Sequence, residues 1–417
     1  MSPAAPLIFF TILAPAAGLM AFFAGKGFAG LGGAAGLLAL LLLLVRRQML
    51  PALTLPSSRL LLAWIAAGLL SAFWSIDARN SLETMQGLTA LLVAALCLLS
   101  LAQLIDLPTD ERWQRRLACG LIGGFLILSL LLLVDQATRG GVYAVTIGAL
   151  KRRNDWIANI NIRAGVLVTL LLWPAMLAAW WLTAKRFWLP ALLYLIGGIA
   201  AYVSPQVTAK LAFAAGSAAG LFIWLGRRNA ALLLGSLVAL VMLLTPFVLG
   251  RLFSAEAAIE SYPSLHYSAK HRLHVWDFVA ERYLERPWLG WGIDAARLLP
   301  GGDAELASGG EQVPSHPHNG ILQFWLELGL LGGALLLAGQ WLIWRAIAAP
   351  HWTPSARAAA AAAFITALCY FLASFNTWHS WWIGLLAVSF SLLIVAMRSF
   401  GRSAAYGGVS LGCFSSA

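Results

Sequence analysis

Long runs of apolar residues, separated by short polar connections, follow one another along nearly the whole chain. Most runs hold roughly 18 to 22 residues, enough for an α-helix to cross about 30 Å of hydrocarbon while satisfying its own backbone hydrogen bonds. No run shows the period of two that is typical of a transmembrane β-barrel. The pattern predicts an all-α integral membrane protein of about twelve spans, at residues 6–24, 27–45, 59–76, 84–105, 116–135, 163–184, 187–204, 208–225, 229–249, 318–344, 356–375 and 379–398.

The polar connections divide the chain into four parts. Residues 1–249 hold nine predicted spans, residues 250–317 form a long polar loop, residues 318–400 hold three more spans, and residues 401–417 form a tail rich in Gly and Ser. If the N-terminus is cytoplasmic, most basic connections fall on the cytoplasmic side, as the positive-inside rule requires. The tail is then cytoplasmic, and the long loop, larger than any connector needs, is periplasmic.

Composition supports this interpretation and narrows the possible partners. The 417 residues are 60% apolar and only 11% charged, too few solvating side chains for a soluble globule. The formal charge of +11 needs no nucleic-acid partner, because most Lys and Arg lie in pairs at helix ends. The four cysteines have no metal-ligand spacing, and the chain contains no Walker loop, GxSxG or HExxH motif. We therefore expect membrane lipid as the surroundings and no metal site.

The long loop contains one clear helical pattern. Residues 267–285 place Leu273, Trp276 and further apolar residues on one face, with Arg272 one turn before Trp276. A proline at position 287 then ends the helix. Glycine-rich turns make up most of the remaining loop.

The return of the loop to the membrane carries a candidate base. His318 lies at the mouth of the tenth predicted span, and histidine titrates near neutral pH, so it can accept a proton from a hydroxyl nucleophile. An alternative is purely structural: His318 and Asn319 cap the helix, while Glu327 and nearby glycines serve close packing. The segment alone does not separate these two interpretations.

Three basic residues fall on the same predicted side as His318. Arg272 and Arg163 carry guanidinium groups, which bind diphosphate oxygens in a bidentate manner, and Lys210 lies a few residues inside a span, where a cation without an anionic partner is costly. Arg272 can also be a solvated loop charge, and Arg163 a snorkelling residue. Taken together they indicate a group transfer from a lipid-linked diphosphate, with histidine as base, cations stabilising the leaving group and no metal required.

Several short motifs resemble those of the O-antigen ligase and polymerase superfamily of Gram-negative bacteria. They are His318-Asn319 followed by Glu327-Leu328-Gly329 and Gly332; Arg272 and Trp276 followed by Pro287 and Gly290-Trp291-Gly292; Trp74-Ser75-Ile76-Asp77 with Ser81; and Asn161-Ile162-Arg163-Ala164-Gly165 with Trp173-Pro174. The chain departs from the family at Ile162, which is inserted, and at Lys210, where many members have a serine-arginine pair.

The resemblance implies an O-antigen ligase: a multi-pass glycosyltransferase of the C type (GT-C) in the bacterial inner membrane that needs no cofactor, metal or nucleotide sugar. Such enzymes transfer polysaccharide from undecaprenyl diphosphate to a sugar of the lipid A core at the periplasmic face. The implied roles are His318 and Arg272 in catalysis; Arg163, Lys210 and Arg272 in diphosphate binding; and Asn319, Glu327 and Trp276 in support.

Other functions fit parts of the pattern. A polymerase of repeat units, or a ligase acting on another polymer or on proteins, needs the same donor site and differs only in the acceptor. A transporter of lipid-linked sugars belongs to a different class, but transporters commonly show paired repeats and ionisable residues deep in the bundle. The chain shows no repeat, and its candidate residues gather on one side of the membrane, which favours an enzyme.

Overall fold

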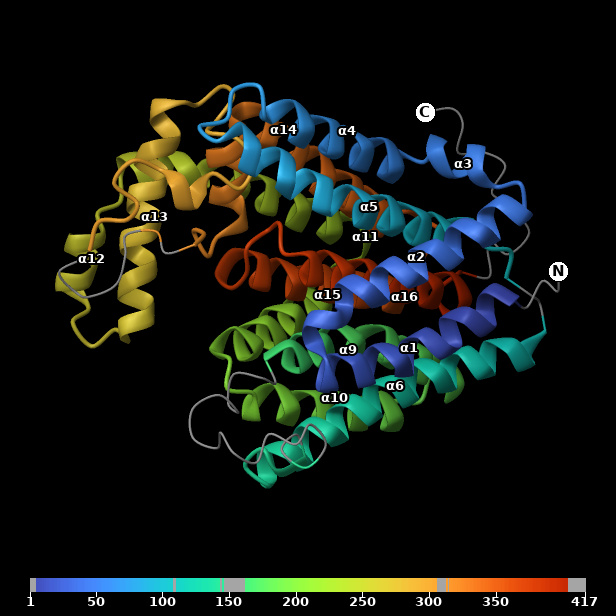
Figure 1. Ribbon diagram of the computed structural model, residues 1–417. Coiled ribbons are helices and arrows are strands. Elements are labelled where there is room, and N and C mark those ends of the chain that lie inside the picture. The colour runs from blue at the N-terminus through green and yellow to red at the C-terminus, as the bar shows by residue number, and fades with distance from the viewer. Residues whose placement is uncertain are drawn as a thin grey trace.

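The computed structural model describes residues 5–107, 110–142, 145, 162–305, 313 and 315–403. Within these ranges the chain is a bundle of helices without a β-sheet (Figure 1). The elements are α1 (Ala5–Phe23), η1 (Gly25–Gly27), α2 (Phe28–Val45), α3 (Met49–Thr54), α4 (Pro56–Ser71), α5 (Ala78–Leu104), α6 (Glu111–Ala137), α9 (Ile162–Leu182), α10 (Trp188–Val203), α11 (Val207–Arg251), α12 (Ala255–Ser261), α13 (Tyr267–Glu285), η2 (Ala296–Leu298), α14 (Gly320–Ile347), α15 (Pro354–Ala373) and α16 (Ser380–Phe400).

A helix occupies the position of every predicted span, which confirms the all-α membrane architecture. In the described part of the chain, ten helices are long and apolar enough to cross a membrane, counting the two halves of α11, Val207–Gly226 and Arg228–Arg251, separately. The other two predicted spans correspond to α4 and α10, which have 16 residues each and fall short of that length. The apolar runs at these two places were therefore predicted correctly as helices but extend less far than the sequence suggested.

Short polar side chains at the helix starts explain where several helices begin. The Asp77 carboxylate accepts a hydrogen bond from the backbone N–H of Asn80 at the start of α5. Thr353 accepts one from Ala356 at the start of α15, where Pro354 occupies the first turn. Such side chains satisfy backbone donors that have no partner within the helix.

Where the structure describes them, the connections predicted to be periplasmic gather at one end of the bundle, which we call the loop end. Here the indole N–H of Trp74 donates to the Leu289 carbonyl at 2.7 Å, and the amide of Gln206 donates to the Ser374 hydroxyl at 3.1 Å. At the opposite end the Arg398 guanidinium donates to the Ala102 carbonyl. In Figure 1 the loop end is on the left, where α12 and α13 project from the bundle.

The helix predicted within the long loop is confirmed, since α13 spans Tyr267–Glu285. Its buried face is formed by Val275, Val279, Ala280 and Tyr283, while Trp276 is half-buried. The buried face is rotated from the predicted one because α13 lies against both α11 and α14. The Tyr283 ring, for example, packs against Trp325 of α14 at a centroid distance of 5.6 Å.

Some predicted features lie outside the described residues. These are the basic run at 151–153, Asn161 of the motif that contains Arg163, Cys413, and residues 404–417 of the predicted tail.

Candidate active site

A break in α14 organises the loop end. Gly329 interrupts the helix with φ +58° and ψ −144°, a conformation that only glycine adopts readily. The freed carbonyl groups accept hydrogen bonds from the long loop: Trp291 N–H donates to Leu326 at 2.9 Å and Gly292 N–H to Glu327 at 2.9 Å. The Glu-Leu-Gly and Gly-Trp-Gly motifs therefore meet in one interface, which fixes the loop against the transmembrane bundle.

Glu327 lies at the centre of this interface and is fully buried. One carboxylate oxygen accepts from the Gln323 amide at 3.1 Å, and the other accepts from the Asp294 backbone N–H at 2.8 Å and from the Trp378 indole. A buried carboxylate is tolerated only when hydrogen bonds replace its hydration, and here both oxygens are paired. Glu327 thus joins α14 to the long loop and to the connection before α16.

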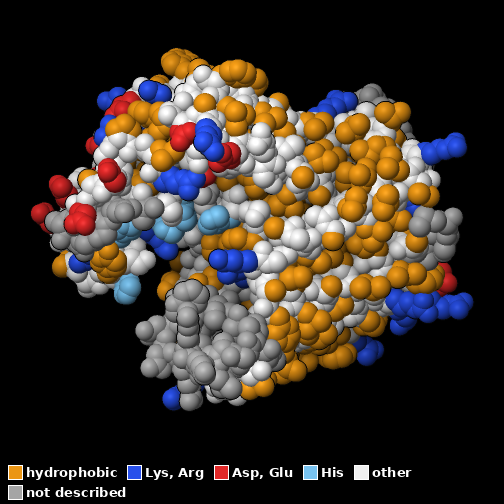
Figure 2. Space-filling view, in the orientation of Figure 1, with side chains coloured by type: hydrophobic (Ala, Val, Ile, Leu, Met, Phe, Trp, Pro, Cys, Tyr) orange, Lys and Arg blue, Asp and Glu red, His pale blue; other side chains and the backbone are white. Residues whose placement is uncertain are grey.

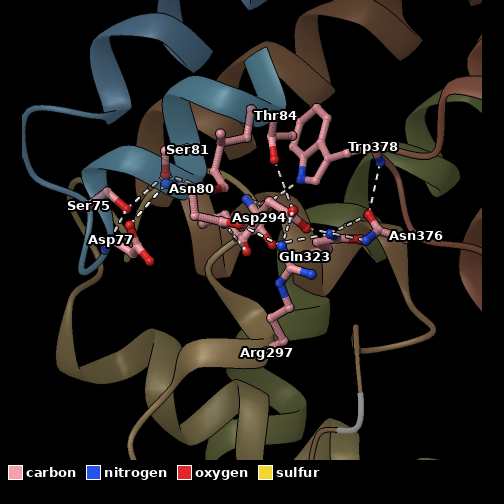
Figure 3. Close-up of polar contacts among 12 residues, drawn as sticks. Ser75, Asp77, Asn80, Ser81, Thr84, Asp294, Arg297, Gln323, Asn376 and Trp378 are labelled. Carbon is pink, nitrogen blue, oxygen red and sulfur yellow. Dashed lines mark hydrogen bonds and ion pairs between the residues drawn. The ribbon is translucent and has the colours of Figure 1, made fainter. Parts of the chain in front are cut away.

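The same network reaches the start of α5 through Asp294 (Figure 3). Asp294 accepts hydrogen bonds from the Thr84 hydroxyl at 3.0 Å and from the Arg297 guanidinium at 3.2 Å. Asn376 donates to its other carboxylate oxygen at 3.4 Å and accepts from Gln323 at 2.9 Å. We call the residues Gln323, Glu327, Asp294, Asn376 and Trp378 the carboxylate network.

The Trp-Ser-Ile-Asp motif also has a structural position here. The Ser81 hydroxyl donates to the carbonyl of Ile293 at 2.8 Å, and Asn80 donates to the carbonyl of Asp294 at 3.1 Å (Figure 3). Backbone N–H of Ile76 donates to the Trp291 carbonyl at 3.1 Å. The motif therefore holds the loop segment that carries Asp294 and positions the site indirectly.

His318 lies next to this network, at the mouth of α14. Its backbone is left-handed (φ +54°), and its Nδ1 is 3.2 Å from the carbonyl oxygen of Ser374. A carbonyl oxygen only accepts, so Nδ1 carries the proton in this bond and Nε2 of the neutral ring keeps its lone pair. The next residue, Asn319, caps α14 by accepting from Ile321 and Leu322 N–H. The structure gives Asn319 the capping role and leaves His318 a nitrogen able to take up a proton.

Two further histidines surround His318, and we call the three rings the histidine cluster. The His316 ring is 4.1 Å from the His318 ring and 5.7 Å from the His379 ring, measured between centroids. His316 is only 6% exposed, and its Nε2 is buried without a hydrogen-bond partner in the part of the chain that the structure describes. Burial is the main cause that lowers the pKa of His316, to about 3, and it also lowers the pKa of His318. Both rings are therefore neutral at pH 7, as a proton acceptor must be.

Arg272 and Arg163 approach the histidine cluster from different elements. Arg272, on α13, is close enough for its charge to contribute to the lowered pKa of His318, after burial. Arg163, in the first turn of α9, lies over the Trp381 ring at 4.6 Å, two residues beyond His379. Within the described ranges neither arginine forms an ion pair, and the Nε of Arg163 is buried without a partner. Two guanidinium groups without counter-ions at one place indicate an anion-binding site.

Other predicted site residues take different positions. The Trp276 indole donates to the carbonyl of Pro317 at 3.0 Å and so ties α13 to the segment that carries the histidines. Lys210 is exposed, with its ammonium group 5.2 Å from the centre of the Tyr202 ring. Thr208, two residues earlier on α11, faces the cluster instead, since its hydroxyl accepts from Ser374 at 3.1 Å. Residues two apart lie on opposite sides of a helix, so the structure does not bring Lys210 to the arginines.

Sequence reasoning missed several residues of this region. His316 and His379 received no role, and neither did Asp294 or Asn376. One signal was available: six of the seven histidines fall on the predicted periplasmic side, four in the long loop and two at the mouths of spans. The spacing between residues 316–318 and 379 concealed their contact, because only the fold brings those connections together.

A depression in the surface borders the cluster. Figure 2 shows the surface hollowed between the lobe that contains α12 and α13 and the rest of the bundle, with His side chains along the hollow and Lys and Arg side chains beside it. Arginine cations, neutral histidines and access from solvent next to a membrane span form an arrangement able to bind an anionic, lipid-linked substrate and remove a proton from its reaction partner.

Comparison with known proteins points to the same class of membrane enzyme. A family model described as O-Antigen ligase matches residues 192–337, a range that contains Arg272, His318 and Glu327. A protein of Rickettsia conorii named "Putative polysaccharide ligase" is 29% identical over 324 residues, 75% of this chain and 73% of the relative. A protein of Rickettsia prowazekii with the same name is 36% identical over 140 residues, 33% of this chain and 34% of that protein. The matches and the architecture together support an assignment of the chain to the O-antigen ligase family.

Proposed function

We propose that the protein transfers polysaccharide from undecaprenyl diphosphate to a sugar hydroxyl of the lipid A core, completing lipopolysaccharide. The observation that carries this proposal is that Arg163 and Arg272, which have no acidic partner among the described residues, lie near the neutral, half-buried His318 at the loop end. The names of the relatives favour a ligase over a polymerase of repeat units, which needs the same donor site.

His318 is the proposed base. The acceptor hydroxyl gives its proton to His318 Nε2 as its oxygen bonds to the anomeric carbon of the donor glycan. The bond between that carbon and the diphosphate oxygen breaks at the same time, and its electron pair leaves with the diphosphate. Proton removal by a positioned side chain contributes about 10²- to 10⁴-fold to such a step.

Arg272 and Arg163 are the proposed diphosphate ligands. The leaving group gains negative charge as the bond breaks, so cations already fixed in place stabilise the transition state more than the ground state. This scheme uses side chains of the chain alone, without a cofactor or metal. Lys210 was predicted as a third ligand, but its exposed position on the other side of α11 gives no support to that role.

The proposed location is the inner membrane, with the loop end in the periplasm. The basic connections that contain Arg46, Lys185 and Arg345 lie at the opposite end, as the positive-inside rule requires for the cytoplasmic side. This orientation exposes the histidine cluster on the side where lipid-linked polysaccharide and the lipid A core are both present in Gram-negative bacteria.

A gene deletion in the native host tests the proposal. Lipopolysaccharide is separated by gel electrophoresis, and undecaprenyl-linked polymer is probed in parallel. We expect loss of the long-chain ladder with polymer accumulating on the carrier, and restoration by the wild-type gene. Loss of the ladder with only single capped repeats would instead identify a polymerase, and an unchanged ladder would contradict a role in lipopolysaccharide.

A further inference from the structure

A short turn between the first two helices lies against the proposed diphosphate site. The turn is η1, Gly25–Gly27, and carries Lys26 at its centre. Gly25 meets the side chain of Arg163 so closely that a Cβ at this position would lie 2.7 Å from Arg163 Cδ. The absence of a side chain at Gly25 therefore allows Arg163 to pass over the turn, next to Lys26.

The packing of α2 against α16 holds this turn in place. Gly32 of α2 and Gly384 of α16 lie so close that a Cβ on Gly32 would be 2.9 Å from Gly384 Cα. The turn immediately before α2 is thereby fixed beside the start of α16, where His379 and Trp381 are located. Backbones in such close contact leave little freedom for sliding, so the Lys26 backbone is a rigid support.

Lys26 extends from this support without an acidic partner. It is exposed, and within the described residues no Asp or Glu forms an ion pair with it. Partial desolvation lowers the pKa of His379; Asp294 opposes that shift, and the charges of Arg163 and Lys26 add to it. Lys26, Arg163 and His379 thus share one electrostatic neighbourhood, with Arg272 on the other side of the histidine cluster.

We infer that Lys26 is a ligand of the diphosphate group, acting with Arg163 on the phosphate farther from Arg272. The inference rests on the proposed function and extends it to a residue that neither the sequence motifs nor the family match assigns. Two guanidinium groups balance the two charges of the esterified diphosphate, but the leaving diphosphate gains a further negative charge as its bond to the sugar breaks. The compact ammonium group of lysine suits a point contact with this added charge beside a bidentate arginine.

Binding of farnesyl diphosphate to the purified full-length protein tests this assignment, with farnesyl monophosphate as the comparison ligand. The variants are Lys26→Ala, Lys26→Arg, Arg163→Ala and, as a matched control, Lys185→Ala, which removes an exposed lysine at the opposite end of the bundle. We expect Lys26→Ala to weaken diphosphate binding about tenfold, corresponding to about 1.4 kcal/mol. Monophosphate binding should change less, Lys26→Arg should retain most of the affinity, and Lys185→Ala should bind as the wild type does.

The outcomes separate this inference from the proposed function. If Arg163→Ala weakens diphosphate binding and Lys26→Ala does not, the proposed function stands and the role of Lys26 is refuted. If the wild-type protein shows no preference for the diphosphate over the monophosphate, both are refuted. Gel filtration and thermal unfolding of each variant exclude misfolding as the cause of a loss.

Discussion

The carboxylate network and the histidine cluster lie side by side at the loop end, yet they differ in whether their buried polar atoms have hydrogen-bond partners. Glu327 is completely buried and has hydrogen bonds on both oxygens from groups on three parts of the chain. At the histidine cluster, by contrast, His316 Nε2 and the neighbouring Arg163 Nε are buried without a hydrogen-bond partner among the described residues. Paired polar groups stabilise a fold, whereas buried polar groups without a partner near a cluster of cations mark a candidate binding site.

This difference distinguishes residues that hold the site in position from residues that can take part in the reaction, although both kinds occur in the same sequence motif. His318 and Glu327 belong to one motif and lie on one helix or at its mouth, but only His318 has a free nitrogen next to unpaired arginines. Glu327 and Asp294 hold the surrounding segments in position. The following experiments test that division, from the largest expected effect to the smallest.

Replacing His318 with Ala should have the largest effect on activity. We expect loss of the base to lower the initial rate of polysaccharide transfer by about 100-fold or more, while the amount of protein in the membrane stays the same. Transfer is measured in membrane vesicles against protein level by immunoblot. His266→Ala, an exposed histidine at the start of α13, is the matched control. Full activity of His318→Ala would overturn the assignment of the base.

Replacing Arg272 with Lys should lower kcat/KM for the lipid-linked donor by about tenfold or more, because the charge is kept but the bidentate geometry is lost. The comparison is Arg79→Lys, an exposed arginine at the loop end that pairs with Glu83 on the surface. Equal activity of Arg272→Lys and the wild type would show that Arg272 contributes charge alone or does not bind the donor.

Replacing Glu327 with Gln should affect stability first. The neutral amide presents N–H groups to neighbours that are themselves donors, and loss of such buried bonds costs about 2 kcal/mol or more. We expect a lower thermal unfolding midpoint in detergent, with activity lost in proportion to the unfolded fraction. Glu83→Gln, on the surface, should leave the midpoint unchanged. A variant of normal stability with no activity would move Glu327 from positioning into the chemistry.

Stability should also fall in mild acid. A histidine whose pKa is lowered in the folded state takes up protons more readily when the protein is unfolded, so protonation favours unfolding. The pKa of His316 is lowered from 6.5 to about 3 by folding. The neutral His316 ring is therefore compatible with full stability above pH 6.5, and the free energy of unfolding decreases as the pH falls from 6.5 toward 3. We expect the unfolding midpoint of His316→Asn to depend less on pH between 7.5 and 5 than that of the wild type. Parallel pH profiles would show that His316 is not the buried neutral ring described above.

Replacing Lys210 with Ala should have the smallest effect. An exposed side chain away from the arginines contributes little, and we expect a change in transfer rate of about twofold or less. The test is the same vesicle assay, with Arg163→Ala measured beside it. A loss comparable to that of Arg163→Ala would restore the role that the sequence motif assigned to Lys210.

The sequence predicted the helices well because lipid imposes one strong requirement: each span must be long, apolar and internally hydrogen-bonded. It also singled out Arg272 and His318, which the fold brings into one neighbourhood and whose roles stay predictions. The sequence also proposed Lys210, but it did not determine the side of α11 on which Lys210 lies, opposite Thr208. It could not assign His379 or Lys26, whose roles depend on contacts between connections far apart in the chain.

The break in α14 limits which segments of this protein can be exchanged with those of a relative. Because Trp291 and Gly292 complete the backbone hydrogen bonding of a transmembrane helix at Leu326 and Glu327, the long loop is not a separable module. A chimaera that takes the loop from a relative must also take the start of α14 and the turn at residues 74–81, or the recipient is left with exposed carbonyls within the membrane. The long loop can therefore be exchanged between relatives only together with these two segments, and we expect that the loop expressed alone does not fold.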